Sequence, residues 1–151
     1  MYTNTITIFN RYSSLQGDFW YAKVIENVDL IVDKAAINAK YGTDSTDTAK
    51  LHVKYALDEE NKINISGYRY YPPKEWENLT NDMLETAITF RSGQKFDFFV
   101  EGALEFDAPI DDSNYRNGFY DYMNKQYDNV FAISSSSSPY TIIKHFEIMG
   151  K

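Results

Sequence analysis

Short segments in which apolar and polar side chains alternate constrain the fold of this chain more than any other feature of its sequence. In residues 3–10, TNTITIFN, threonines alternate with isoleucines. In residues 49–57, AKLHVKYAL, Leu51, Val53 and Tyr55 alternate with lysine and histidine side chains. A period of two residues is typical of a β-strand with one buried face. We therefore expect both segments to be strands of a sheet.

Further strands are predicted where β-branched and aromatic residues lie between turn residues. Gly17 indicates a turn after the first strand, and Glu26-Asn27 separates two candidate strands, which favours a hairpin there. The other segments expected to be extended are 18–24, 27–33, 63–73, 87–90, 95–102, 129–134 and 140–151.

Helical structure is expected as a single turn over 74–79, a short helix over 80–86 and a longer one over 115–128. Residues 34–48 fit either a short helical turn or an irregular strand that ends at Gly42, followed by an exposed polar loop.

One segment, RSGQKFDFFVEG at 91–102, is rich in aromatic residues and bounded by glycines. As a strand it would have one wholly apolar face and one mixed face. The apolar face consists of Phe96, Phe98 and Val100, and the mixed face of Asp97, Phe99 and Glu101.

Many short strands separated by turns predict a mainly β fold, at the border of the α+β class. We expect a small antiparallel β-barrel or sandwich with one or two short helical insertions. No internal repeat or long linker divides the sequence, so residues 1–151 are expected to form a single domain.

Composition disfavours several classes of function. The formal net charge of −7 is unfavourable for a protein that neutralises phosphates, so we expect no specific nucleic-acid recognition and no binding to anionic membranes. No signal peptide is expected, and the longest apolar runs fall far short of the ~20 residues that span a bilayer. The absence of cysteine excludes disulfides and thiolate metal sites.

No arrangement of residues predicts catalysis, a cofactor or a metal site. His52 shares a strand face with two lysines, and His145 lies on the closing strand, so both are expected to be structural. Loop carboxylates do not match the ligand spacing of a calcium-binding loop and are expected to cap turns. These carboxylates are Asp44, Asp47, Asp107, Asp111 and Asp112.

Aromatic residues gather in SGYRYYPPKEW, at 66–76. Flat aromatic side chains with a polar edge suit contacts with sugars, peptides or other proteins, but ordinary packing of a Pro-rich segment explains the same cluster. The candidate interaction surface predicted from the sequence consists of Tyr68, Tyr70, Tyr71, Trp76, Phe99 and Tyr140.

Several short motifs also occur in a particular order. An opening TITI strand is followed by a Trp-Tyr strand that leads to Val-Asp-Leu, then by GQKFDFFVEG and finally by HFEIMGK. Over most of the chain, this order resembles small structural proteins of tailed phages and prophages that are identified as minor capsid or head–tail connector proteins.

The resemblance implies a mechanical function in head–tail joining or head completion. Such proteins assemble as rings in the virion after synthesis in the cytoplasm of the bacterial host, and they contact portal, adaptor or tail proteins. Residues 95–102 would form a central barrel strand, with Phe99 directed toward a helix or a neighbouring subunit. The loops at 42–48, 107–114 and 134–139 would make contacts with partners, because loops on a rigid scaffold commonly carry binding.

Two other classes of function compete with this interpretation. A carbohydrate- or peptide-binding β module would use the aromatic cluster from Tyr68 to Trp76. An enzyme with paired carboxylates would require a deep cleft in which Asp and Glu side chains converge.

Overall fold

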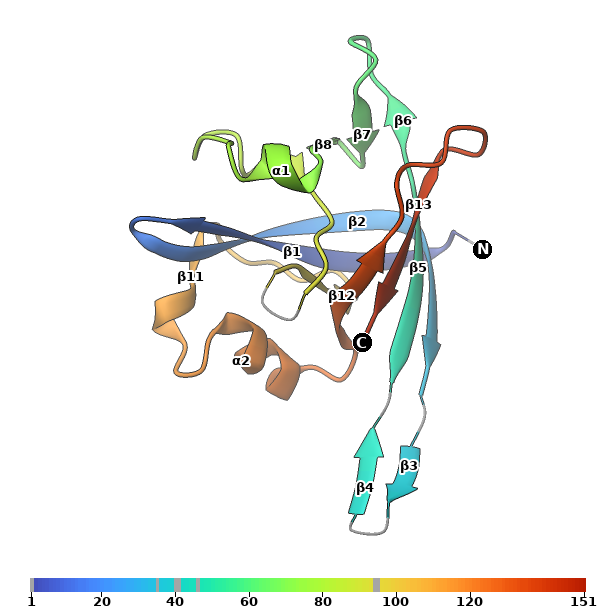
Figure 1. The fold of residues 1–151 in the computed structure, drawn as a ribbon, viewed down its shortest axis with the longest axis vertical. Coiled ribbons are helices and arrows are strands. Elements are labelled where there is room, and N and C mark those ends of the chain that lie inside the picture. Colours follow the sequence, from blue (N-terminus) through green and yellow to red (C-terminus); the bar gives the residue numbers. More distant parts are fainter. Residues whose placement is uncertain (1, 35, 40–41, 46, 94–95) are drawn as a thin grey trace.

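Six strands close into an antiparallel β-barrel (Figure 1) in a computed structural model that describes residues 2–34, 36–39, 42–45, 47–93 and 96–151. The strands are β1 (Asn4–Ser14), β2 (Gly17–Asp33), β3 (Ala36–Ala39), β4 (Gly42–Ser45), β5 (Thr48–Lys54), β6 (Ala56–Leu57), β7 (Ile63–Ile65), β8 (Tyr68–Tyr70), β9 (Ala87–Ile88), β10 (Phe98–Glu101), β11 (Ile110–Asp111), β12 (Val130–Ser136) and β13 (His145–Gly150). The helices are α1 (Pro73–Trp76) and α2 (Phe119–Gln126), with a 3-10 turn at Asp112–Asn114.

The barrel strands follow the order β1, β10, β12, β13, β5 and β2, and the pairing of β1 with β2 closes the ring. Every one of these pairs is antiparallel. The mainly β fold class and the small antiparallel barrel predicted from the sequence are therefore confirmed.

Strand β2 pairs first with β1 and then, from Asp29 onward, with β5. The change of partner coincides with Asn27, whose φ is 57°, and with a register shift against β1. Asparagine tolerates this left-handed conformation better than most residues. The predicted hairpin at Glu26-Asn27 is thus wrong, because the turn residue forms a bulge that bends one continuous strand.

Alternate residues of the barrel strands fill its interior, as the period-two segments predicted. Leu51 and Val53 of β5 are buried, and so are Phe146 and Ile148 of β13. The interior cluster consists of Ile6, Ile8, Ile25, Val28, Ala49, Leu51, Val53, Tyr55, Ile65, Ile88, Phe90, Phe99, Phe131, Ile133, Phe146 and Ile148.

The orientation expected for Phe99 is wrong. Phe99 points into the barrel, where its ring lies 5.6 Å from that of Phe131. Phe98 and Val100 point outward, and they are nevertheless buried because α2 covers this side of the barrel through Phe119 and neighbouring residues. Both faces of β10 are therefore buried. Phe99 packs in the barrel interior, and Phe98 packs in the apolar cluster between the barrel and α2.

Helix α2 begins at Phe119 and not at residue 115 as predicted. Gly118 precedes it with φ of 90°, a conformation that favours glycine and cannot continue a right-handed helix. Asp112 accepts a hydrogen bond of 2.8 Å from the backbone N–H of Phe119 and one of 2.9 Å from Trp20 Nε1. The loop carboxylate thereby joins the start of α2 to β2.

Residues 71–91 cover one end of the barrel with a third apolar cluster, formed by Tyr21, Trp76, Leu79, Leu84 and Ala87. The predicted helical turn is confirmed as α1, whereas the short helix predicted over 80–86 is a series of turns that leads into β9. The predicted extended segment at 63–73 folds into a β7–β8 hairpin at Ser66-Gly67, where both φ angles are positive.

Strands β3 and β4 form a separate hairpin that projects from the barrel beyond β2 and β5 (Figure 1). The irregular strand considered for 34–48 is thus confirmed over Ala36–Ala39, while part of the polar stretch expected to be a loop is strand β4. Residues 35, 40, 41 and 46 lie outside the described residues, and so do all side chains between 35 and 46.

Candidate functional site

Two residues of the predicted interaction surface are not on the surface. Phe99 fills the barrel interior, because strand alternation places it on the same face as the other inward side chains. Trp76 is fully buried at the end of α1, and its Nε1 donates a 2.9 Å hydrogen bond to the backbone oxygen of Arg11. Neither side chain is able to contact a partner, so both are removed from the candidate surface.

The remaining predicted residues are partly or largely accessible. Tyr68, Tyr70 and Tyr71 are half-buried, and the Tyr70 ring lies 4.7 Å from that of Phe146. Tyr140 is exposed, and its ring stacks at 4.7 Å on His145. The structure therefore distributes these residues over one end of the barrel.

A groove of about 530 Å³ runs between the β7–α1 region and the loop that follows β12. Tyr70 and Phe90 contribute its aromatic wall, and residues 136–139 contribute the opposite wall. The loop predicted over 134–139 is wrong in its first half, because β12 continues to Ser136. The lining residues are Asn61, Lys62, Ile63, Tyr70, Pro72, Pro73, Glu75, Phe90, Ser136, Ser137, Ser138 and Pro139.

One wall of this groove is the end of β12. Pairing between β12 and β10 extends only from Val130 to Ala132, whereas pairing with β13 continues to Ser136. Within the described residues, Ser134–Ser136 consequently has a strand neighbour on the β13 side alone. Such an edge is able to receive a further extended segment.

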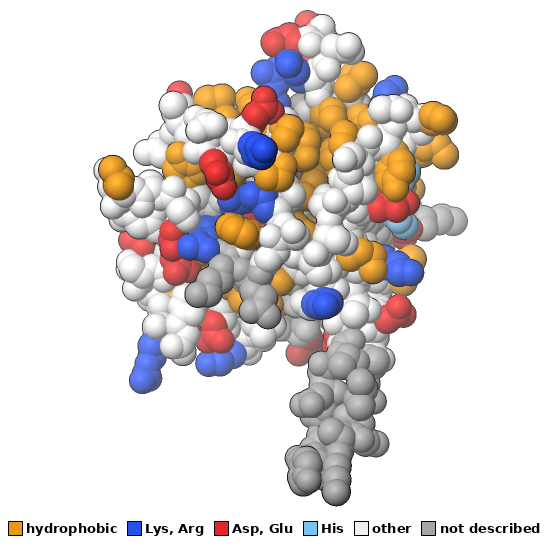
Figure 2. Space-filling view, in the orientation of Figure 1, with side chains coloured by type: hydrophobic (Ala, Val, Ile, Leu, Met, Phe, Trp, Pro, Cys, Tyr) orange, Lys and Arg blue, Asp and Glu red, His pale blue; other side chains and the backbone are white. Residues whose placement is uncertain are grey.

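Next to the groove, apolar side chains are exposed at the β12–β13 turn. Ile142 and Ile143 are 97% and 70% exposed, and so, to a smaller degree, are Tyr140 in the same turn and Leu57 at the end of β6. We call Leu57, Tyr140, Ile142 and Ile143 the apical patch. Figure 2 shows hydrophobic side chains gathered over this upper end of the molecule.

Sequence reasoning missed the two isoleucines, because it assigned 140–151 to one alternating strand. The structure begins β13 only at His145, so Ile142 and Ile143 lie in a turn and have no barrel interior to enter. Two adjacent isoleucines close to Pro139 were the available signal for a turn with exposed apolar tips.

A buried polar cluster lies at the end of the barrel covered by α1. Lys23 is 1% exposed and Asn10 is 0% exposed, and Lys23 Nζ donates a hydrogen bond of 3.0 Å to Asn10 Oδ1. Asn10 also donates from Nδ2 to the backbone oxygen of Thr89 at 2.7 Å. The ring of Trp76 lies over the Lys23 ammonium position at 4.6 Å.

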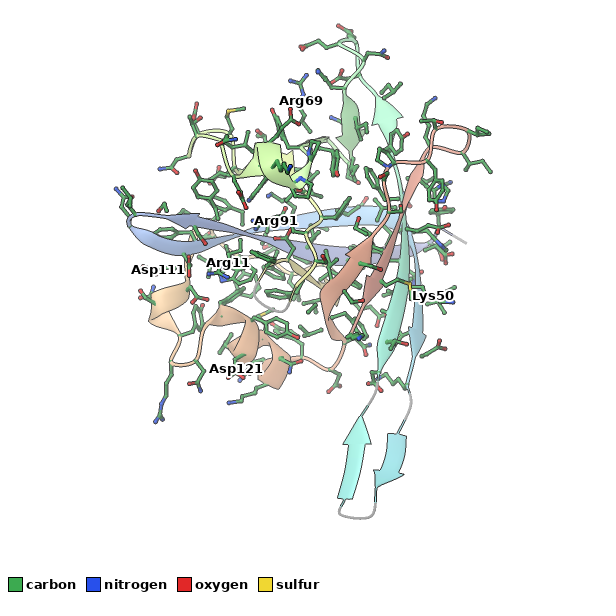
Figure 3. The ribbon with its side chains drawn as sticks, in the orientation of Figure 1. Arg11, Lys50, Arg69, Arg91, Asp111 and Asp121 are labelled. Carbon is green, nitrogen blue, oxygen red and sulfur yellow. The ribbon has the colours of Figure 1, made fainter. Side chains whose placement is uncertain are left out.

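A buried ion pair adjoins these residues. Asp97 and Arg91 meet through Oδ1 and Nη2 at 3.1 Å and through Oδ2 and Nε at 3.2 Å. The Asp97 carboxylate also accepts the backbone N–H groups of Arg11 at 3.0 Å and Arg91 at 2.9 Å. Figure 3 shows Arg91 and Arg11 close together where the 71–91 segment passes the β1–β2 ribbon.

Burial dominates the electrostatics of this cluster. Loss of water lowers the pKa of Lys23 to about 7, although the nearby Asp97 charge opposes the shift. Burial likewise raises the pKa of Asp97, and the Arg91 guanidinium opposes that rise. Since arginine stays protonated, Arg91 and Asp97 balance each other and a neutral Lys23 leaves the cluster without net charge.

Sequence reasoning predicted no functional role for Asn10, Lys23, Arg91 or Asp97. Asn10 has the same strand parity as Ile6 and Ile8, so an inward position was readable from the alternation. Strand β1 pairs with both β2 and β10, and these pairings place Lys23 and Asp97 next to Asn10 although the three residues are far apart in the chain.

The two histidines lie on the outer face of the barrel. His52 Nδ1 lies 3.4 Å from Asp29 Oδ2, and its Nε2 lies 3.8 Å from Glu147 Oε1. His145 Nε2 lies 3.3 Å from the same Glu147 oxygen. These partly solvated side-chain contacts join the neighbouring strands β2, β5 and β13.

Two of the five loop carboxylates, Asp111 and Asp112, have structural partners. Asp111 accepts a 3.0 Å hydrogen bond from the N–H of Ser113 and caps the 3-10 turn, as Asp112 caps α2. Asp107 is exposed, and the side chain of Asp44 is outside the described ones. In the part of the chain that the structure describes, no three His, Asp or Glu side chains are grouped to hold a metal ion.

A second hollow, of about 480 Å³, contains three carboxylates and is the nearest approach to an acidic cleft. Asp18 pairs with Arg11 Nη2 at 2.7 Å, and Asp121 pairs with Lys125 at 3.1 Å. The third, Asp112, caps α2. All three carboxylates have structural partners.

The model of one protein family matches residues 1–151, and that family is described as a family of unknown function, DUF6751. The chain belongs to DUF6751. No curated protein and no solved structure matches it. Among the described residues of this DUF6751 member, no helix has the length and apolar character needed to cross a membrane.

Proposed function

We propose that the chain is a non-enzymatic structural protein of a phage or prophage virion that acts in head–tail joining or head completion through protein–protein contacts. The observation that carries this proposal is the apical patch. Exposed isoleucines at a turn are unfavourable in water, and contiguous exposed apolar groups mark contact sites.

The surroundings of the patch suit docking to another protein. The patch is held on a closed barrel, which gives the turn a rigid base. The adjoining groove has an aromatic wall, and the edge of β12 reaches it at Ser136, so an extended segment of the partner would add to β12. The resemblance in motif order makes portal, adaptor or tail proteins the expected partners, with several copies arranged as a ring.

The competing interpretation as a carbohydrate-binding module loses its strongest feature. Trp76, the largest aromatic residue of the predicted platform, is fully buried and packs on Lys23. Of the tyrosines that remain, Tyr70 lines the groove that the end of β12 enters, and a strand edge there favours a polypeptide ligand.

The proposal is tested by placing a charge on the patch. In the phage or prophage that encodes the chain, the double substitution Ile142→Asp and Ile143→Asp is expected to weaken the contact by about tenfold or more per side chain, because anchors lose their apolar burial. Electron micrographs should then show DNA-filled heads separate from tails, and plaque formation should fall.

Leu15→Asp is the matched control. Leu15 is as exposed as Ile142 but lies at the β1–β2 turn, far from the patch. Its substitution should leave joined particles, and circular dichroism should show that all variants fold. Infectious, joined particles with the doubly substituted protein would contradict the proposed contact, and absence of the protein from purified virions would contradict the structural role.

A further inference from the structure

An amine and a carboxamide lie side by side inside the barrel. Lys23 on β2 and Asn10 on β1 are diagonal neighbours, since Asn10 is in register with Tyr21 and Lys23 with Ile8. Lys23 Nζ is 3.0 Å from Asn10 Oδ1, and the buried carboxylate of Asp97 adjoins both. We propose that Lys23 and Asn10 react with each other after folding to form an isopeptide bond, with release of ammonia.

The amine in this site is a nucleophile. Lys23 is the buried lysine among the described residues, and Arg91 already balances the charge of Asp97 at 3.1 Å. Burial away from water, together with the nearby Arg91 charge, lowers the pKa of Lys23 to about 7, so a large share of the amine is neutral at neutral pH and has its electron pair free. Desolvated lysines are recognised nucleophiles toward carbonyl groups.

The carboxamide is held in one orientation. Asn10 Nδ2 donates to the backbone oxygen of Thr89 at 2.7 Å, while Oδ1 faces the amine. The attacked atom, Cγ, is therefore fixed next to Nζ by groups from β1, β2 and the segment before β10. Such fixed proximity replaces a bimolecular encounter and lowers the barrier to reaction.

The step is balanced without any other reagent. Lys23 Nζ attacks Asn10 Cγ and forms the new C–N bond, while the carbonyl electrons move to Oδ1. When the carbonyl re-forms, the Cγ–Nδ2 bond breaks and Nδ2 leaves as ammonia. The proton that Nζ loses passes to Nδ2, and Asp97 is the carboxylate placed to relay it.

The surroundings protect the product. Trp76 covers Lys23 at 4.6 Å and is itself fully buried, so water that would hydrolyse the bond is excluded. The bond would tie β1 to β2 across their shared ribbon. A covalent tie at this point limits separation of the two strands under load, which suits but does not require the proposed role in a virion.

The test is the intact mass of the purified, denatured protein. The expected value lies below the sequence mass by one ammonia. After trypsin digestion, the peptide that ends at Arg11 should be joined to the peptide that begins at Tyr12 and continues through Lys23 to Lys34, because trypsin does not cleave after an acylated lysine.

Variants assign the reacting groups. Lys23→Met should have its full sequence mass, whereas Lys50→Met, which changes an exposed lysine of β5, should still lose ammonia. Asn10→Asp should lose water in place of ammonia, and its linked product should have the same mass as the linked wild type. Asp97→Asn should slow or abolish the loss while circular dichroism shows a folded barrel.

A wild-type protein that is folded and has its full sequence mass after prolonged incubation at neutral pH would overturn the proposal. Loss of ammonia without the joined peptide, as in succinimide formation at an asparagine, would also count against it. Because the readout is a mass, failure of this bond and failure of the proposed virion function are separate results.

Discussion

At the scale of single residues, Lys23 is the most unusual member of the chain. Its side chain is buried beside Asn10, Asp97 and Arg91, and the Trp76 ring covers it. A lysine in this position normally costs stability, since its charged form is separated from water. Wherever Lys23 remains a free amine, the cluster therefore makes the stability of the protein depend on pH.

We predict this dependence for a chain in which Lys23 remains a free amine, such as Asn10→Ala. The pKa of about 7 in the folded protein is below the ordinary lysine value, so between these values the unfolded chain binds a proton that the folded chain does not. The free energy of unfolding should consequently rise with pH above about 7, by at most about 1.4 kcal/mol per pH unit. Below about pH 7, Lys23 is protonated in both states, and the full cost of burying its charge lowers the stability of the folded protein.

Urea denaturation at about pH 7 and about pH 9 measures the effect. The double variant Asn10→Ala and Lys23→Met is the control, because it lacks the amine and should lose this rise. An equal pH dependence in both proteins would show that Lys23 does not titrate as its burial requires.

At the scale of elements, the bend of β2 at Asn27 allows one strand to serve two partners. The strand pairs with β1 along its first part and crosses to β5 for its last five residues, Asp29–Asp33. A straight strand would leave the barrel open at this corner, so the bulge is what closes it.

We predict that Asn27→Val destabilises the protein by about 1–2 kcal/mol, because a β-branched residue is strained at a φ of 57°. Asn27→Gly should be close to neutral, since glycine adopts positive φ freely. Thermal and urea denaturation of the three proteins provide the comparison. Equal stability of the valine and glycine variants would show that the bulge does not depend on this backbone conformation.

At the scale of the whole molecule, the barrel and the β3–β4 hairpin are separable. Strands β3 and β4 pair with each other, and the last rung shared by β2 and β5 joins Asp33 to Thr48. We predict that replacing residues 34–47 with a short Asn-Gly turn changes the free energy of unfolding by less than about 1 kcal/mol, because short loops close at low cost.

The measurement is a urea titration with both the midpoint and its slope. A large loss of stability would show that the hairpin contributes to the barrel, whereas normal stability with loss of head–tail joining would assign it a role in contacts.

Much of this architecture was predictable from local pattern. The alternation around Leu51 and in 145–149 fixed which side chains face inward, because strand geometry alone determines it. The inward position of Phe99 and the burial of Trp76 were not predictable, since they depend on which distant strands and helices cover each face. The Lys23 cluster was missed for the same reason, as Asn10 and Thr89 are joined by a hydrogen bond across 79 residues.

The position of β13 has a consequence for synthesis of the chain. This strand lies between β5 and β12, yet it consists of residues 145–150, which leave the ribosome after every other strand of the barrel. Before β13 is synthesised, β5 and β12 each have an unpaired edge, and the apolar side chains of the barrel interior remain accessible to water on that side. Closure therefore waits for translation to pass β13, and the nascent protein depends on its polar exterior or on chaperones to avoid aggregation meanwhile.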